Sequence, residues 1–221
     1  MALSACGPGV DVSESASPVG AREHNITFAT GTDWRTFTID PGERLDDEDV
    51  ALGPAESVCL QPGYPPTCPA GAVMYDSFWQ SWTADLAPIL GAQWIWATGV
   101  GPSTAPAGMA HFYFSRSVLV AGRPNSGWLA IASDDYTVVH VNGQEVGSVG
   151  SVTDQDAAAW ANFHLTTFDI SAALRPGQNV ITLDSMNGPY FCPPGCTYHD
   201  NPAGVVAGGT ITYGPAAFVT P

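Results

Sequence analysis

Short runs in which hydrophobic and polar residues follow a strand-like pattern fill the middle of the chain. Residues 128–132, Trp-Leu-Ala-Ile-Ala, form an apolar run that suits burial of a strand against a second sheet. Residues 136–141 alternate, with Thr137, Val139 and Val141 on one face of an extended chain and the other three residues on the opposite face. Two short strands are therefore predicted in this segment.

Turn residues separate and close these two runs. Ser133, Asp134 and Asp135 follow the first run and predict a tight acidic turn. Asn142 and Gly143 follow the second run, and both tolerate the positive φ that a two-residue hairpin turn needs. The segment predicts the framework of a β-sandwich that displays loops, and not an active-site strand pair.

Further strand-like runs flank this segment on both sides. In Trp94-Ile95-Trp96 the two indoles project to the same face of a strand, and the core is the better prediction for both. Two later runs contain the segments Asp169-Ile170-Ser171 and Pro176-Gly177-Gln178-Asn179, which form one unit of the pattern. The runs cover residues 25–28, 34–39, 94–96, 111–120, 167–171 and 174–183, and a closing strand follows residues 201–204.

This order of strands and turns resembles the galactose-binding-domain-like jelly roll, a superfamily of β-sandwiches. The resemblance covers about residues 24–214. It implies an antiparallel sandwich of two sheets, glycan binding at loops, and a structural Ca²⁺ near the ends of the domain. Asp33 is the residue of this chain in which that possible calcium site would be tested, and its simpler role is in a turn or cap.

Composition decides the number of domains. The 221 residues include 24 Gly and 19 Pro, and no segment shows helical periodicity long enough to cover a parallel sheet. We therefore expect an all-β protein, an antiparallel jelly-roll β-sandwich with long loops and extended terminal arms. The expected parts are an N-terminal arm at residues 1–23, one domain at residues 24–214 and a C-terminal tail at residues 215–221.

Charge excludes two classes of partner. The chain has 21 acidic and 6 basic residues, and all the basic residues are Arg. Such a surface repels nucleic-acid phosphates and offers no basic patch to anionic lipid. No run of about 18 apolar residues is present, so no membrane span is expected.

The first residues of the chain bear on where the protein is located in relation to the cell. Leu3-Ser4-Ala5-Cys6 resembles the end of a bacterial lipoprotein signal, but the charged and apolar segments that precede such a sequence are missing. A virion or extracellular location is expected, with the bacterial cell surface as the alternative.

Four of the five cysteines flank two short loops that are rich in Pro. Cys59 and Cys68 bound the first loop, and Cys192 and Cys196 bound the second. The spacing is compatible with one disulfide in each loop and equally with cross-pairing between the loops. A zinc site is the competing interpretation, since His199 follows Cys196 closely, but the first loop lacks a second short ligand pair. We expect disulfides, which form in an oxidising location.

Catalytic patterns are weak in this sequence. There is no Gly-x-Ser-x-Gly motif, and the paired carboxylates Asp134 and Asp135 are adjacent in a predicted turn. Adjacent turn carboxylates more often accept hydrogen bonds from nearby backbone N–H groups than catalyse. The sequence predicts no enzymatic activity.

Glycan binding is the activity that the resemblance implies. Sugars stack their apolar faces on aromatic rings, while carboxylates and amides bind their hydroxyls. The loop at residues 187–201 is the densest cluster of both kinds of side chain. The candidate rings in predicted loops are Tyr190, Tyr198, Trp160 and Tyr64, and the candidate polar partners are Asn187, Asp200 and Asn201.

Two functions follow from these observations. The first is a non-catalytic structural or adhesive protein of a virion or other extracellular assembly, such as a phage decoration or fibre-like protein, whose arms contact other subunits. The alternative is a secreted carbohydrate-binding module of a glycan-degrading system. A monomer that binds glycans would favour the module, whereas arms that clasp neighbouring subunits would favour the assembly.

Overall fold

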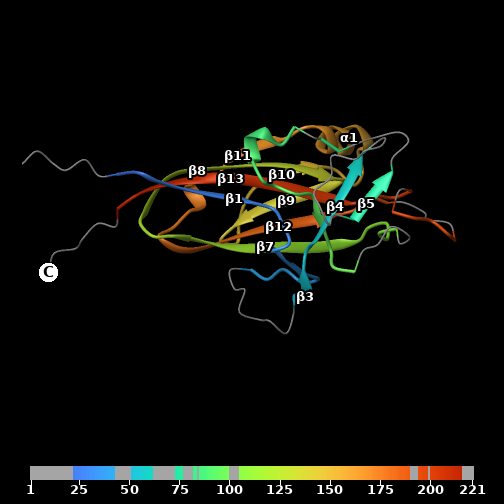
Figure 1. Ribbon diagram of the computed structural model, residues 1–221, viewed down its shortest axis with the longest axis horizontal. Helices are drawn as coiled ribbons and strands as arrows, with labels where there is room; N and C mark the ends of the chain where they lie inside the picture. The colour runs from blue at the N-terminus through green and yellow to red at the C-terminus, as the bar shows by residue number, and fades with distance from the viewer. Residues whose placement is uncertain are drawn as a thin grey trace, which may run out of the picture.

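The protein is a sandwich of two β-sheets. The computed structural model describes residues 22–42, 51–61, 73–76, 82–83, 85–99, 105–189, 194–198 and 200–215. Figure 1 shows two layers of strands that run along the long axis of the molecule, with a short helix toward one end. The predicted all-β sandwich is confirmed.

The first sheet has seven strands in the order β11-β8-β13-β6-β4-β5, and β1 also pairs with β13. Its pairs are antiparallel except that β4 and β5 are parallel, a departure from the antiparallel arrangement expected throughout. The strands are β1 (His24–Ala29), β4 (Glu56–Gln61), β5 (Val73–Asp76), β6 (Ile95–Trp96), β8 (Arg123–Asp134), β11 (Thr166–Asp169) and β13 (Gly204–Gly214).

The second sheet has six strands in the order β10-β9-β12-β7-β2-β3, and its pairs are antiparallel. Two short 3₁₀ helices complete the described elements, η1 (Ala87–Ile89) and η2 (Ser171–Ala173). The strands are β2 (Arg35–Phe37), β3 (Ala51–Pro54), β7 (His111–Val120), β9 (Tyr136–Val141), β10 (Gln144–Gly150) and β12 (Gly177–Met186).

The core lies between the sheets and follows the predicted alternation. Along β9, Thr137, Val139 and Val141 are buried, while the residues between them are half-buried. Trp94 and Trp96 are both buried, as predicted. Burial of each large apolar side chain contributes roughly 1.5–3 kcal/mol, so a continuous core of this kind is the main source of stability. Other members that are fully buried are Phe114, Leu129, Ile131, Ile181, Leu183 and Ile211.

The acidic residues after the first predicted strand join two sheets and do not form a hairpin. Strand β8 continues through Asp134 and belongs to the seven-stranded sheet, whereas β9 starts at Tyr136 in the six-stranded sheet. The peptide bond between Asp134 and Asp135 is cis. The two carboxylates therefore lie where the chain crosses between the two layers of the sandwich.

The helix α1 (Gln155–Phe163) was not predicted. Asp154 caps it, because its side chain accepts hydrogen bonds from the backbone N–H groups of Asp156 and Ala157. Trp160, expected in a loop, lies on this helix instead. Within the described part of the chain, no helix is long and apolar enough to cross a membrane.

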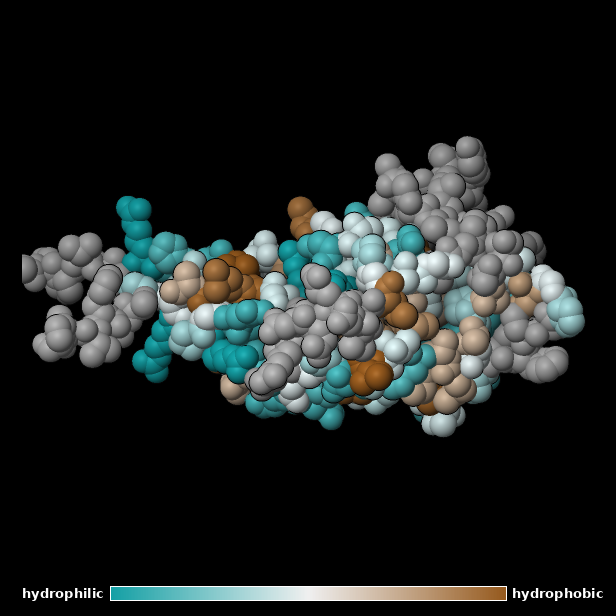
Figure 2. All heavy atoms as spheres, turned by 90° about the horizontal axis from the view of Figure 1, so that it is seen from below, coloured by the Kyte–Doolittle hydropathy of each residue, from teal (hydrophilic) through white to brown (hydrophobic). Residues whose placement is uncertain are grey.

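Exposed apolar side chains are scattered. Figure 2 shows one face on which brown, hydrophobic residues form small separate groups among teal and white ones. Isolated exposed apolar residues are normal on soluble domains and need no partner to explain them. Among the described residues they are Ile39, Leu52, Leu90, Met109, Leu119, Trp160 and Phe163.

The Asn142-Gly143 turn is confirmed and does more than reverse the chain. Both residues have positive φ, at 53° and 75°. The Asn142 side chain donates to Ala173 O at 2.8 Å and to Asn179 Oδ1 at 2.9 Å, and it accepts from Val180 N at 3.0 Å. The turn between β9 and β10 is thereby tied to the beginning of β12.

We expect Asn142→Ala to lower the free energy of unfolding by about 2–3 kcal/mol, because alanine disfavours positive φ and the partners of the amide lose their hydrogen bonds. Urea denaturation measures this change. Asn142→Gly is the matched control, since it keeps the permitted φ and removes only the side chain. Equal losses in the two variants would contradict a contribution from backbone conformation.

Candidate functional site at the crossing between the sheets

A pocket of about 430 Å³ opens beside the point where the chain crosses between the sheets. The beginning of α1, which lines this pocket, lies toward one end of the sandwich (Figure 1). The segment between β10 and α1, the beginning of α1 and two later loops line it together with Asp135. The lining residues are Asp135, Ser151, Val152, Thr153, Asp154, Gln155, Ala158, Gly188, Pro189 and Asn201.

Asp135 is held in place by a close backbone contact. The backbone N–H of Gly188 donates to Asp135 Oδ2 at 2.5 Å. A Cβ atom at position 188 would lie 2.6 Å from the same oxygen, so only glycine lets the loop approach this closely. This bond fixes one carboxylate oxygen, and an ionised carboxylate has lone pairs for further donors.

Asp134 lies buried behind Asp135. Trp82 Nε1–H donates to Asp134 Oδ2 at 2.7 Å, and the Trp82 ring stacks on Trp94 with 4.4 Å between ring centroids. Burial raises the pKa of Asp134 well above its usual value, the charge of Asp135 raises this pKa further, and the Trp82 bond opposes the shift. While Asp134 keeps its proton, the pair carries a single negative charge, on Asp135 at the pocket.

Asn201 supplies a second polar group to the pocket. It is 7% exposed, and its Nδ2 donates to Pro106 O at 2.8 Å. Its Oδ1 accepts no hydrogen bond from the described residues. Since this oxygen is not fully buried, it is open to solvent, and a bound molecule that donates a hydrogen bond to it would take the place of water.

The rim beside α1 is rich in oxygen atoms. Ser151 Oγ accepts from the backbone N–H groups of Thr153 and Asp154, at 3.1 Å and 3.0 Å. Asp154 is exposed and caps α1. Within the described lining there is no Arg or His, and the chain contains no Lys. The pocket therefore offers mainly acceptor groups and negative charge.

Two of the predicted glycan-binding residues are structural instead. Tyr198 is fully buried and its hydroxyl donates to Ala203 O, so its ring cannot serve as a stacking platform. Asn187 is also fully buried, and its Nδ2 donates to Ala107 O at 3.1 Å. Both predictions fail for the same reason, because these two side chains are buried and bonded inside the fold.

The other predicted glycan-binding residues are dispersed. Asn201 lines the pocket. Asp200 is exposed and accepts from Thr197 N at 2.7 Å, as a turn residue does. Trp160 is 60% exposed, stacks on His164 at 3.7 Å and does not line the pocket. Tyr190 and Tyr64 lie outside the described residues.

The calcium and cysteine expectations also find no support here. Asp33 pairs with Arg116 at 2.9 Å, so a guanidinium already neutralises the carboxylate that was expected to bind Ca²⁺. Among the described residues, no group of three or more His, Cys, Asp or Glu side chains could hold a metal ion. Of Cys59, Cys68, Cys192 and Cys196, only the Cys196 side chain is described, and the disulfides stay predictions.

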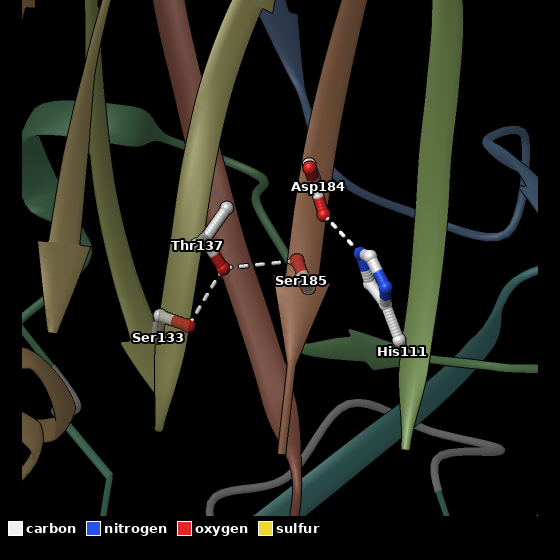
Figure 3. A network of polar contacts seen from close by, with 5 residues as sticks. All are labelled: His111, Ser133, Thr137, Asp184 and Ser185. Atoms are coloured by element: carbon white, nitrogen blue, oxygen red, sulfur yellow. Dashed lines mark hydrogen bonds and ion pairs between the residues drawn. The ribbon is translucent and has the colours of Figure 1, made fainter. Parts of the chain in front are cut away.

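Polar contacts on β12 serve both faces of its sheet (Figure 3). His111 on β7 bonds to Asp184 on β12, and Tyr113 lies beside this pair. Burial raises the pKa of Tyr113, and the charges of Asp184 and Asp40 add to the shift. A separate chain of hydroxyls joins the two sheets, with Thr137 Oγ1 lying 2.7 Å from Ser133 Oγ and 2.9 Å from Ser185 Oγ.

The sequence did not predict that Asp135, Gly188 and residues 151–155 would lie together in one pocket. The available signal was the Asp-Asp pair at the end of a strand, which was interpreted as a turn. The partners of this pair are 53 and 52 residues away in the chain, at Gly188 and Trp82, so no local pattern announces them.

Comparison with known proteins yields only partial similarity. No protein-family model and no curated protein sequence matches the chain. Among solved structures, the α-L-rhamnosidase of Streptomyces avermitilis is 23% identical, with a TM-score of 0.40, over 52% of this chain and 10% of its own. A β-glucuronidase from Ruminococcus gnavus is 12% identical, with a TM-score of 0.41, over 85% of this chain and 29% of its own.

The β-D-mannosidase of Dictyoglomus thermophilum is 16% identical, with a TM-score of 0.27, over 34% of this chain and 8% of its own. The chain matches between 8% and 29% of the length of these three glycosidases. Similarity at this level carries no argument about function, which has to come from the site itself.

We expect Asp134→Asn to flatten the dependence of stability on pH. In the unfolded chain the Asp134 carboxyl group loses its proton near pH ~3.9, whereas in the folded protein it keeps the proton to a higher pH. The stabilisation is therefore complete below the unfolded-state pKa and is lost as pH rises through the folded-state pKa. The asparagine has no proton to lose, and its oxygen still accepts from Trp82.

Urea denaturation of both proteins between pH 4 and pH 8 measures the difference, a range set by the unfolded-state pKa of about 3.9 and the raised folded-state value. The wild-type free energy of unfolding should fall relative to that of the variant as pH rises. Parallel curves for the two proteins over this range would show that the pKa of Asp134 is not raised in the folded protein.

Proposed function

We propose that this chain is a carbohydrate-binding module, built on a galactose-binding-like β-sandwich, that holds a sugar in the pocket beside Asp135. The pocket volume of about 430 Å³ falls in the range of small-molecule sites, about 300–1,000 Å³. The observation that carries the proposal is the convergence of Asp135 and Asn201 on one concave site.

The arrangement suits hydroxyl groups. Sugar hydroxyls donate hydrogen bonds to carboxylate and amide oxygens, and such bonds to a charged acceptor contribute about 1.5–3 kcal/mol each. Asp135 is positioned before binding by Gly188, so little conformational entropy is lost when a ligand arrives. The wall formed by Ala158 and Pro189 supplies apolar surface for the C–H groups of the ring.

The proposal is for binding without hydrolysis. Glycoside hydrolysis commonly uses two carboxyl groups on opposite sides of the scissile bond, about 5–10 Å apart. Here the two carboxyl groups belong to adjacent residues, and Asp134 is buried behind Asp135 against Trp82. Of this pair only Asp135 lines the pocket, and the other lining carboxylate, Asp154, caps α1, an arrangement that suits recognition.

The extracellular or cell-surface location remains part of this proposal. The virion role rested on terminal arms that clasp neighbouring subunits, and residues 1–21 and 216–221 lie outside the described part of the chain. No described contact supports that role, so the module is the function that the pocket favours.

We expect the purified protein to be retained by a panel of immobilised oligosaccharides, and Gly188→Ala to weaken binding about tenfold or more, which corresponds to ~1.4 kcal/mol. A methyl group at residue 188 would lie 2.6 Å from Asp135 Oδ2 and displace the carboxylate. Isothermal titration calorimetry with the retained glycan measures the loss.

Gly214→Ala is the matched control, because its Cβ would meet only Asn125, at 3.7 Å. Far-ultraviolet circular dichroism and thermal unfolding show whether each variant is folded. Absence of retention on any glycan would overturn the proposed function. Retention that is equal in the two glycine variants would place the binding site elsewhere on the protein.

A further inference from the structure

The charge of the pocket lining indicates which class of sugar the pocket would bind. Two carboxylates line it, from Asp135 and Asp154, and no cationic side chain stands among the described lining residues. Asp154 is exposed, so solvent screens its charge, whereas Asp135 is partly buried and its charge is felt more strongly. A ligand in this pocket therefore meets negative charge that no cationic side chain of the described lining offsets.

The hydrogen-bonding groups point to the same kind of ligand. The Asn201 side chain is more than nine-tenths buried, lines the pocket and has an oxygen without a donor among the described residues. Asp135 can accept further bonds beyond the one from Gly188. Both groups are acceptors, so the complementary group on a ligand is one that donates several hydrogen bonds.

We propose that the pocket selects sugars that carry a protonated primary amine, such as glucosamine residues, over their N-acetylated and carboxylated counterparts. An ammonium group has three donors and no acceptor, and its charge complements that of Asp135. An N-acetyl group removes the charge and two of the donors, and a uronic carboxylate would repel Asp135. This inference rests on the proposed function, since it names the class of sugar for the same pocket.

The experiment compares three oligosaccharides of equal length: one of glucosamine, one of N-acetylglucosamine and one of a uronic acid. Calorimetry is done near pH 6, where the amine is protonated, and at two salt concentrations. The glucosamine oligomer should bind at least about tenfold more tightly than the N-acetylated one, and the uronic oligomer should not bind detectably.

The chain has a net charge of −15, so its surface could attract any amine. The variants must therefore distinguish binding in the pocket from attraction to the acidic surface. Asp135→Asn should abolish the preference for the amine. In this single variant Asp134 gains freedom to ionise, so the double variant D134N/D135N, which leaves no carboxylate on the pair, is measured beside it. Glu145→Gln removes one exposed charge on β10, outside the pocket, and should keep the preference.

Each outcome decides the point. A preference for the amine that is lost in Asp135→Asn or in the double variant, and kept in Glu145→Gln, supports the inference. Equal binding of the amine and N-acetyl oligomers overturns it while the proposed function stands. Binding that is abolished by a chelator and restored by Ca²⁺ also overturns it, because the negative groups would then serve a cation. Failure of every glycan to bind overturns the proposed function itself.

Discussion

The hydrogen bond from Trp82 to Asp134 is the interaction on which this end of the sandwich depends. It brings a carboxyl group into the core at the place where β8 ends and the chain passes to the other sheet. A buried acid is tolerated only with partners or without its charge, and here an indole N–H and a raised pKa of the carboxyl group meet that requirement. Because Asp134 is anchored, Asp135 is turned toward the loops and becomes available to a ligand.

The packing around this bond explains why the pocket has a fixed shape. Trp82 stacks on Trp94, and the ring lies so close to Gly204 that a Cβ there would be 2.6 Å away. The hydroxyl chain through Thr137 joins the sheets next to the same crossing. Core, crossing and pocket wall are thus one connected structure, which favours binding with little rearrangement.

Strand existence was largely predictable, and side-chain roles in loops were not. Alternation predicted β9, and strand-like runs in an order that resembles a jelly roll predicted β7, β12 and β13, since such patterns depend on neighbouring residues in the sequence. Tyr198 and Asn187 were predicted as binding residues because they lie in the loop with the densest cluster of aromatic and polar side chains, yet both are buried and bond to Ala203 and Ala107. The helix α1 was missed because nine residues after an Asp cap give a short periodic signal.

The sequence by itself determined the all-β class, the two-residue turn at Asn142 and the acidic character of the molecule, because these depend on local periodicity, backbone preference and composition. Only the tertiary structure decided that Asp134 is buried, that Asp135 faces a pocket, and that Asn201 joins it. These facts depend on contacts between residues that lie 52, 53 and 95 positions apart. Such contacts form when two sheets pack, and no short stretch of sequence contains them.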